Sequence, residues 1–344
     1  MRTLVTGSAG FIGSTLARQL LDLGHSVRGI DCFTDYYDPM LKWLNVQDLL
    51  ADPGYELVRA DLAEAELRPL LRDVDVVFHL AGQPGVRGSW ADGFGPYVEL
   101  NVLATQRLLE AATQSRVNRF VYASSSSVYG NAATFPCREH DEPQPFSPYG
   151  VTKLAGEHLV RLYASNYGLP TVALRYFTVF GPRQRPEMAM SQLIEAGLTG
   201  TPFRCFAAPG AVRDFTYVED TVAGTVLAGT VADIAPGTVL NVAGGTPATM
   251  NDVIDLVGEI MGSPVQVQTE PSCAGDVLRT GGDHEPIRRL LGWRPSVGLH
   301  EGLARQVAWH RRRRELRVTP QRHTAVHLPP HPAAVALPVE EGVS

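Results

Sequence analysis

The sequence is short of long apolar runs, of cysteine and of positive charge. It has no run of about 18 apolar residues, so we expect no membrane-spanning helix. Its 344 residues carry a formal net charge of −6, which argues against a nucleic-acid partner. Its four cysteines, Cys32, Cys137, Cys205 and Cys273, are scattered and form no C-x-x-C pair. We therefore predict neither a disulfide framework nor a metal site.

The N-terminus also lacks the basic and apolar regions of a signal peptide, because a strand pattern starts at residue 2. Together with the isolated cysteines, this predicts a cytoplasmic protein with reduced thiols. The composition, 44% hydrophobic and 19% charged, is typical of a globular enzyme with a large core.

Short apolar runs alternate with amphipathic stretches through the first half of the chain. The runs expected to be buried strands span residues 2–6, 27–31, 56–62, 74–82, 119–127 and 171–177. Helical patterns follow the first run and cover residues 101–115 and 149–167. This alternation predicts an α/β fold, a Rossmann doubly wound parallel sheet.

The regular alternation ends near residue 178. We predict a Rossmann domain over residues 1–177, a smaller α/β C-terminal substrate lobe over 178–316, and a flexible tail rich in proline and histidine over 317–344. Segments near 212–245 are expected to return to the Rossmann domain, because residues 239–244 have a strand pattern.

A glycine-rich turn, GSAGFIG, follows the first predicted strand. Gly7 permits the tight turn, Gly10 lets the backbone approach a pyrophosphate at a helix N-terminus, and Gly13 lets that helix pack closely. Strand, glycine turn and helix are the context that a dinucleotide site needs. The spacing is G-x-x-G-x-x-G rather than G-x-G-x-x-G, so the turn alone is weak support.

An acidic residue, Asp31, ends the second predicted strand about 20 residues beyond the glycine turn. A carboxylate in this place hydrogen-bonds the adenosine ribose and repels a 2′-phosphate, so NAD is favoured over NADP. Asp61 and the small residues of HLAG (79–82) stand at the C-terminal ends of the next two predicted strands. All of them are expected at the sheet edge where an open α/β sheet binds its ligand.

Tyr149 and Lys153 are four residues apart, so their side chains share one face of the predicted helix. A phenol is a poor base at neutral pH, but a neighbouring ammonium group lowers its pKa by favouring the phenolate. The pair therefore predicts a proton-transfer group, and the four serines at 124–127 can supply the hydroxyl of a proton relay. A Y-x-x-x-K spacing is common, so this interpretation depends on the dinucleotide motifs upstream.

Taken together, the motifs resemble those of extended short-chain dehydrogenases/reductases, in the branch that modifies nucleotide sugars. The resemblance covers roughly residues 1–312 and is carried by GSAGFIG, HLAG, SSSSVYG, YGVTK, RYFTVFGPRQRP and RDFTYVED, with Asp31, Asp61 and Asn101. It implies a Rossmann domain that holds NAD tightly and a lobe that binds a nucleoside diphosphate sugar. It also implies a homodimer that pairs the helices near 101–115 and 149–167 in a four-helix bundle.

The resemblance assigns a role to each motif. Tyr149 would be the base, Lys153 would bind the nicotinamide ribose, and Ser125 would bridge the substrate and Tyr149. The cofactor-binding residues that it implies are Gly7, Gly10, Phe11, Ile12, Gly13, Asp31, Asp61, Leu62, Leu80, Ala81, Gly82, Asn101, Tyr149, Lys153 and Tyr176. The substrate-binding residues are Arg87, Ser125, Ser126, Ser127, Thr178, Arg185, Arg213 and Asp276.

Two of these have a more specific role in the family. Arg213 would contact the diphosphate and Asp276 the uridine ribose, since a guanidinium group is well shaped for phosphate. The alternative for Arg213 is a salt bridge at the domain interface to Asp214 or Glu219.

The serine cluster lacks the acids that two related reactions need. Sugar 4,6-dehydratases that resemble this chain carry an Asp-Glu pair where Ser126 and Ser127 stand, and UDP-glucuronate decarboxylases carry a Glu in the place of Ser127. Dehydration and decarboxylation are therefore disfavoured. What remains is 4-epimerisation, by oxidation at C4, rotation of the ketone and return of the hydride to the other face.

Three segments favour UDP-glucuronate over UDP-glucose. DYYDPMLK, HLAGQPGVRGS and RYFTVFGPRQRPEMA are similar to segments of glucuronate epimerases, and Thr178 stands where UDP-glucose epimerases usually have Asn. The serine hydroxyls and the guanidinium of Arg185 suit a sugar carboxylate. A diphosphate contact or a surface ion pair is an equally open role for Arg185.

Other functions remain open at this point. The runner-up is a 4-epimerase for neutral UDP-hexoses, followed by a UDP-glucuronate decarboxylase. A non-catalytic NAD-binding protein on the same fold is less favoured, because such proteins usually lose the Tyr or the Lys, and this chain has both Tyr149 and Lys153.

Overall fold

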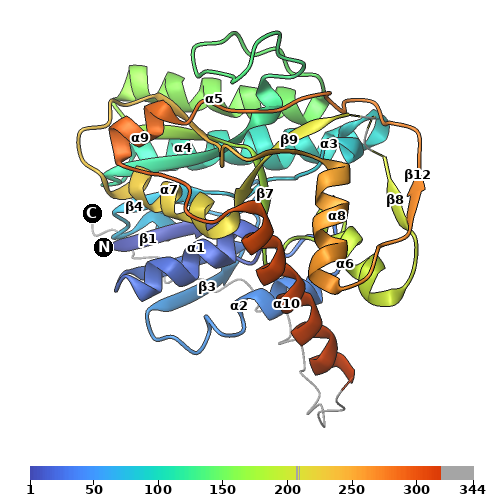
Figure 1. Ribbon diagram of the computed structural model, residues 1–344. Coiled ribbons are helices and arrows are strands. Elements are labelled where there is room, and N and C mark those ends of the chain that lie inside the picture. The colour runs from blue at the N-terminus through green and yellow to red at the C-terminus, as the bar shows by residue number, and fades with distance from the viewer. Residues whose placement is uncertain (207, 209, 319–344) are drawn as a thin grey trace, which may run out of the picture.

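Figure 1 shows the computed structural model of the chain, which describes residues 1–206, 208 and 210–318. Its main sheet consists of seven parallel strands: β1 (Arg2–Thr6), β2 (Ser26–Asp31), β3 (Tyr55–Arg59), β4 (Val76–His79), β5 (Arg119–Ser125), β6 (Thr171–Tyr176) and β10 (Thr238–Val242). A second sheet contains β7 (Thr178–Phe180), β9 (Val212–Tyr217) and β11 (Pro247–Thr249). The short strands β8 (Phe203–Cys205) and β12 (Val267–Thr269) pair with each other.

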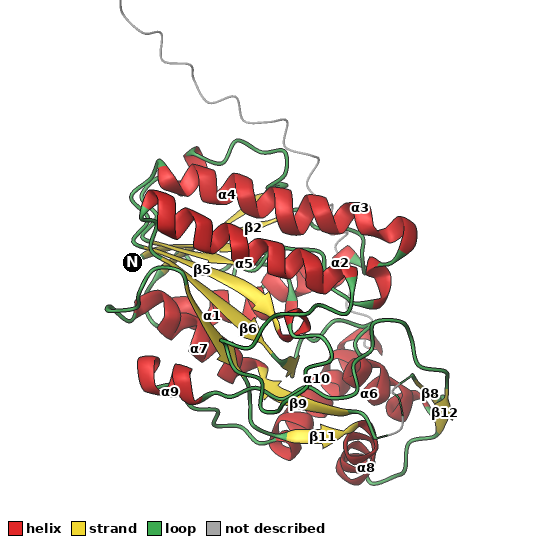
Figure 2. Cartoon of the chain, turned by 90° about the horizontal axis from the view of Figure 1, so that it is seen from above, coloured by secondary structure: helices red, strands yellow, loops and turns green. Residues whose placement is uncertain are grey.

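Helices cover both faces of the main sheet, with α1 and α7 on one face and α4 and α5 on the other (Figure 2). The helices are α1 (Phe11–Asp22), α2 (Pro39–Val46), α3 (Phe94–Tyr97), α4 (Ala104–Thr113), α5 (Pro148–Tyr167), α6 (Ala189–Thr199), α7 (Val218–Thr230), α8 (Met250–Met261), α9 (Glu285–Leu291) and α10 (Leu299–Val318). The predicted α/β fold is thereby confirmed. Within the described ranges, no helix is long and apolar enough to cross a membrane.

The strand order of the main sheet is β10-β6-β5-β4-β1-β2-β3. From β1 the chain proceeds outward through β2 and β3, and then returns to build β4, β5 and β6 on the other side of β1. The order therefore reverses between β1 and β4. Loops that leave neighbouring strands in opposite directions open a crevice at their carboxyl ends, which is where such sheets bind ligands.

The sequence itself explains where α5 begins and ends. The Ser147 side chain accepts a hydrogen bond from the N–H of Gly150 (3.1 Å) and so caps the helix, and Pro148 occupies its first turn. Gly168 ends the helix in a left-handed conformation with φ of 68°, which a residue without Cβ adopts easily. This start places Tyr149 in the first turn, directly beside the carboxyl edge of the sheet.

Several predicted element boundaries differ from those observed, and three of them concern the site. β3 ends at Arg59, so Asp61 lies in the following turn, and β5 ends at Ser125, after which residues 126–128 form a 3₁₀ turn. The helix predicted for residues 101–115 is a π-helical turn, η4 (Val98–Leu103), that continues into α4. Hydrophobic periodicity does not separate π from α geometry, because it records only which side chains are buried.

The segment near 212–245 divides between two sheets. Val212–Tyr217 pairs with β7 and β11, whereas α7 packs on the main sheet and β10 pairs with β6. At the other end of the lobe α10 runs to Val318, so the first two residues of the tail predicted at 317–344 are helical. The rest of that tail lies outside the described residues.

Candidate active site

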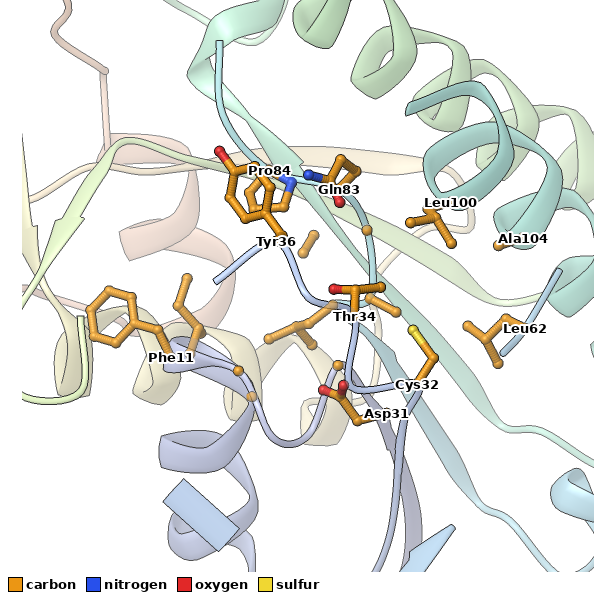
Figure 3. Close-up of a pocket in the computed structure, with 18 of the residues that line it drawn as sticks. Phe11, Asp31, Cys32, Thr34, Tyr36, Leu62, Gln83, Pro84, Leu100 and Ala104 are labelled. Carbon is orange, nitrogen blue, oxygen red and sulfur yellow. The ribbon is translucent and has the colours of Figure 1, made fainter. Parts of the chain in front are cut away.

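A cleft lies at the carboxyl edge of the main sheet, above the point where the strand order reverses (Figure 3). It contains about 1140 Å³ of empty space, including solvent at its mouth. Of the cofactor residues implied by the sequence, the cleft is lined by Gly7, Gly10, Phe11, Ile12, Gly13, Asp31, Asp61, Leu62, Leu80, Ala81, Gly82, Tyr149, Lys153 and Tyr176. The topology thus brings together residues that are up to 169 positions apart (7 to 176) in one elongated site.

The glycine turn between β1 and α1 is too tight for larger residues. Gly7 has φ of 68°, and a Cβ built on it would lie 2.9 Å from the backbone nitrogen of Ala81. A Cβ on Gly13 would lie 2.1 Å from the carbonyl oxygen of Gly7. No side chain caps α1 at Gly10, so N–H groups of its first turn remain available to an anion. A dinucleotide pyrophosphate fits this cradle.

Asp31 lies at one end of the cleft (Figure 3). Its carboxylate accepts hydrogen bonds from the N–H groups of Ala9 (3.1 Å) and Phe33 (2.8 Å), and is held against the glycine turn. Two oxygens have about four lone pairs, so the carboxylate retains acceptor capacity for ribose hydroxyls. The surroundings of Asp31 therefore fit the adenosine half of NAD.

Lys42 is a cleft residue that sequence reasoning did not assign. Its Nζ lies 3.6 Å from the Asp31 carboxylate and donates to Thr34 Oγ1 at 3.0 Å, and the side chain is buried. The DYYDPMLK segment contains this lysine, but its distance from Asp31 becomes evident only once α2 folds back over the β2 end.

A neutral Asp31→Asn variant is expected to bind NADP at least tenfold better relative to NAD than the wild type does. The variant removes the carboxylate that repels a 2′-phosphate, while Lys42 remains to attract it; tenfold corresponds to about 1.4 kcal/mol. Titration of cofactor-stripped protein with NAD and NADP measures the ratio. Asp22→Asn, at the exposed end of α1, is the control, and an unchanged ratio in Asp31→Asn would refute the assignment.

Asn101 has a different place from the other implied cofactor residues, since it is buried and does not line the cleft. Its Oδ1 accepts from the N–H of Gln83 at 2.6 Å, and its Nδ2 donates to the Gln83 carbonyl at 3.1 Å and to Thr152 Oγ1 at 3.0 Å. It therefore fixes the segment after HLAG to α5. The π-helical turn η4 carries Asn101.

The Tyr149 phenol lies beside the Ser125 hydroxyl, and the Tyr97 ring packs edge-on against it at 6.2 Å between centroids. Burial raises the pKa of Tyr149, while the Ser125 hydrogen bond and the Arg185 guanidinium act to lower it. Arg185 is thus a cation that favours the phenolate, a role the sequence had given to Lys153. Burial is the larger effect, so the pKa of Tyr149 lies above its ordinary value.

Lys153 is fully enclosed next to Tyr149, and its Nζ donates to the carbonyl oxygen of Ala123 at 2.9 Å. Burial lowers its pKa to about 8, and the carboxylate of Glu157 acts in the opposite direction. An ammonium group has three donors, so two remain for ribose hydroxyls in the cleft that it lines. Lys153 is therefore placed to bind a cofactor, and its charge is sensitive to its surroundings.

Ser125 ends β5 and organises the serine cluster. Its Oγ accepts from the N–H of Ser127 and donates to Ser127 Oγ, both at 3.1 Å. Ser126 and Ser127 line a second cavity of about 610 Å³ together with Thr178, Arg213 and Asp276. All five were implied as substrate residues, and the cavity carries hydroxyl donors where related enzymes carry acids.

Two arginines flank this second cavity. Arg87 forms an ion pair with Asp276 at 3.2 Å and stacks on the Phe206 ring, with 4.6 Å to its centroid. Arg213 lines the cavity, and burial lowers its pKa. A partly buried guanidinium of this kind is well suited to a diphosphate.

The salt bridges considered for Arg213 are not formed. Asp214 accepts from the N–H groups of Thr246 (3.3 Å) and Gly282 (3.2 Å), and Glu219 pairs with Arg305 at 3.2 Å.

Arg185 lines the cofactor cleft and forms an ion pair with Glu187 at 2.6 Å. The ion pair considered for Arg185 is thus present, and the guanidinium also acts on Tyr149 as described above. Tyr36 was not assigned from the sequence and lies close by: its hydroxyl would be 2.5 Å from a Cβ on Gly85, and Figure 3 shows the ring next to Pro84. The DYYD segment therefore reaches across the cleft towards the catalytic residues.

The sequence pattern of the NAD dependent epimerase/dehydratase family matches residues 3–243. The chain belongs to this family. A relative in Bacillus subtilis, named an uncharacterized UDP-glucose epimerase, YtcB, is 42% identical over 311 residues, which are 90% of this chain and 98% of the relative.

The similar proteins with solved structures include the following two. The crystal structure of UDP-glucuronic acid 4-epimerase from Bacillus cereus, in complex with UDP-glucuronic acid and NAD, has 41% identity and a TM-score of 0.88, and the match covers 91% of this chain and 99% of that one. MoeE5 in complex with UDP-glucuronic acid and NAD has 41% identity and a TM-score of 0.83, with 91% and 100% covered. MoeE5 is also known in complex with UDP-glucose and NAD. The resemblance found in the sequence is therefore confirmed for the family and the fold.

Proposed function

We propose that the protein is a UDP-glucuronate 4-epimerase that retains NAD. The observation that carries this proposal is the hydroxyl-lined cavity of Ser126, Ser127 and Thr178, which Ser127 connects through its hydrogen bond with Ser125 to Tyr149. It offers neutral donors to a C6 carboxylate, and it has hydroxyl groups where related dehydratases and decarboxylases carry acids. The similar enzyme from Bacillus cereus, crystallised with UDP-glucuronic acid and NAD, supports the same assignment.

The reaction needs one proton acceptor and one hydride acceptor. Tyr149 takes the proton of the C4 hydroxyl, directly or through Ser125, while the C4 hydrogen leaves as hydride, so the C–H and O–H bonds break and a C4 ketone forms. When bound, NAD supplies the hydride acceptor. Rotation of the ketone presents its other face, and return of the hydride and of the proton from Tyr149 gives the inverted alcohol. No net oxidation results.

We assign each part of the cofactor to residues that line the cleft. The glycine turn of Gly7, Gly10 and Gly13 holds the pyrophosphate, Asp31 the adenosine ribose, and Lys153 the nicotinamide ribose. The NAD-binding part comprises residues 1–177 with α7 and β10, and the sugar nucleotide binds between it and the remaining lobe. Arg87 and Arg213 hold the diphosphate.

The 4-keto intermediate of UDP-glucuronate is a β-keto acid and can lose CO₂. Ser126, Ser127 and Thr178 would fix the carboxylate by hydrogen bonds and keep the breaking bond out of alignment with the ketone. Release of mainly a pentose nucleotide from UDP-glucuronate by the wild-type enzyme would refute this part of the proposal.

The proposed function is tested by incubating purified protein with UDP-glucuronate and no added NAD, and identifying the product by NMR. UDP-galacturonate is expected, because the cofactor is retained and regenerated in each cycle. Absence of turnover of the acid sugar, with turnover of UDP-glucose, would identify the second candidate, a 4-epimerase for neutral UDP-hexoses. The complex of the similar protein MoeE5 with UDP-glucose is the observation that favours that candidate.

We also infer a homodimer in the cytoplasm. Apolar side chains are exposed along the outer side of α5 and the adjoining turn η4: Val151, Leu162, Tyr167, Val98 and Leu103. Figure 2 shows α4 and α5 side by side at that surface. Several exposed apolar side chains on neighbouring helices are typical of a protein interface. The free cysteines agree with a reducing compartment.

Leu162→Glu is expected to convert the dimer to a monomer, because it places a charge in the centre of an apolar interface; Leu162 is 53% exposed in the single chain. Sedimentation velocity at micromolar concentration measures the mass. Leu290→Glu, on α9 and 43% exposed, is the matched control and should leave the mass unchanged. A wild-type protein that sediments as a monomer would refute the inference.

A further inference from the structure

A buried ion pair lies behind the catalytic residues. Arg175 of β6 donates to Glu157 of α5 through Nε (2.9 Å) and Nη2 (2.7 Å), and both residues are at most 3% exposed. Glu157 is one helical turn beyond Lys153 and two beyond Tyr149 on α5. The pair therefore adjoins the site without lining it.

Glu157 also holds the end of the strand that carries the serine cluster. Ser124 Oγ donates to Glu157 Oε1 at 2.5 Å. Ser124 stands between Ala123, whose carbonyl accepts from Lys153, and Ser125, whose hydroxyl lies beside Tyr149. One carboxylate thus connects the strand end with the helix that bears Lys153 and Tyr149.

Arg175 is held by its own set of contacts. Its guanidinium lies over the Tyr129 ring at 4.7 Å from the centroid, and Nη1 donates to the Glu139 carbonyl at 3.3 Å. The Tyr129 hydroxyl donates to Asn241 Oδ1 at 2.8 Å. A buried ion pair gains little net stability over apolar residues, because both charges lose their water. Its place beside Lys153 therefore suggests a role in the site.

Several ionisable groups surround the Lys153 ammonium group. Those that face it are, from each packed element, Tyr149 and Glu157 of α5, Tyr122 of β5, His79 of β4 and Tyr176 of β6, and Arg175 of β6 is bound to Glu157. The tyrosines are un-ionised unless Tyr149 loses its proton, and burial with Lys153 nearby holds the pKa of His79 at about 3, so this histidine is neutral. Glu157 and Arg175 therefore contribute the two permanent charges of opposite sign.

We propose that Glu157 is a positioning residue for the epimerase: it fixes the Ser124–Ser125 strand end and keeps Lys153 in its charged, hydrogen-bond-donating form, while Arg175 balances its charge. The proposal rests on the proposed function, because it assigns Lys153 to cofactor binding. Glu157 itself touches neither the cleft nor the second cavity. Its effect on the reaction passes through Lys153 and Ser125.

The test uses the sign of the charge that each variant leaves behind. Glu157→Gln leaves the Arg175 cation unbalanced, so Lys153 should lose its proton more easily. The alkaline limb of the kcat–pH profile should then shift to lower pH by about one pH unit. Arg175→Met leaves the Glu157 carboxylate unbalanced and should shift the alkaline limb to higher pH by a similar amount. The double variant removes both charges and should return the limb to its wild-type position.

Two variants separate charge from packing. Ser124→Ala keeps the ion pair, so it should lower kcat by roughly threefold with an unmoved limb, since it removes one hydrogen bond to the strand end. Arg175→Lys keeps the charge and should also leave the limb in place. If Glu157→Gln does not fold, the comparison of Arg175→Met with Arg175→Lys carries the same test.

The proposal is overturned if all variants keep the wild-type limb, or if the two single variants move it in the same direction. A residue that only supported the fold would lower activity without moving the limb. An NMR titration of the Lys153 side-chain nitrogen in the NAD-bound protein makes the same comparison without turnover. If the wild-type protein fails to epimerise UDP-glucuronate, but the variants shift the Lys153 titration as expected, the proposed function is refuted and the role of Glu157 stands.

Discussion

Replacement of Tyr149 by phenylalanine is expected to lower kcat for UDP-glucuronate roughly 10³-fold, or about 4 kcal/mol in the barrier. The phenol is the acceptor for the C4 hydroxyl proton, and the Ser125 hydroxyl beside it carries no charge that could replace it. Phenylalanine preserves the ring and its edge-on packing against Tyr97, so the shape of the site is retained. The rate of UDP-galacturonate formation measures the loss.

The same variant should retain NAD through purification, because the glycine turn, Asp31 and Lys153 are unaffected. The matched control is Tyr163→Phe on the same helix, which removes a hydroxyl that donates to Glu110 Oε2 at 2.7 Å, far from the cleft. The control should keep kcat within about twofold while losing about 1 kcal/mol of stability. Tyr149→Phe with more than a tenth of wild-type activity would show that another group is the base.

Gly13→Ala is expected to abolish NAD retention and to destabilise the protein by about 3 kcal/mol. The added Cβ would lie 2.1 Å from the Gly7 carbonyl oxygen and 3.1 Å from Ser8 Cα. Both are backbone atoms within the turn, so no flexible side chain can move aside, and the turn itself has to open. The N–H groups that face the pyrophosphate would then be displaced. The absorbance of cofactor released on denaturation measures NAD content, and thermal unfolding measures stability.

Gly95→Ala is the control for this prediction. Gly95 lies in the exposed helix α3, and nothing lies within 4 Å of a Cβ built on it. Because alanine favours a helix over glycine, this variant should be neutral or slightly stabilising and should keep its NAD. A Gly13→Ala protein with full NAD content would contradict the close packing of α1 on the turn.

Much of the site could be predicted from the sequence because its parts are local. GSAGFIG is a turn whose geometry depends on three glycines, and the Tyr149–Lys153 spacing places two side chains on one helix face. Asp31 follows a strand at a distance set by one βα unit. Such patterns depend on a few neighbouring residues. All the cofactor residues implied by the sequence line the cleft except Asn101.

The missed features are contacts that depend on how one element folds back over another. Lys42 reaches Asp31 only because α2 folds back over the end of β2, and Arg185 arrives at Tyr149 from the lobe. Asn101 lies in a π-helical turn that hydrophobic periodicity does not distinguish, and its side chain bonds to Gln83 instead of lining the cleft. The cation next to Tyr149, Arg185, could therefore be identified only from the folded chain.

The sequence by itself determined the family, the parallel sheet and the identity of the reacting residues, because glycine turns, strand runs and a Y-x-x-x-K spacing are local constraints. The absence of acids at Ser126 and Ser127 also narrowed the reaction before any fold was known. Only the tertiary structure determines which charged groups lie next to the reacting residues. Arg185 beside Tyr149 and the Glu157–Arg175 pair beside Lys153 bring together α5, β6 and the segment after β7, and their effect depends on burial and distance, which no local pattern records.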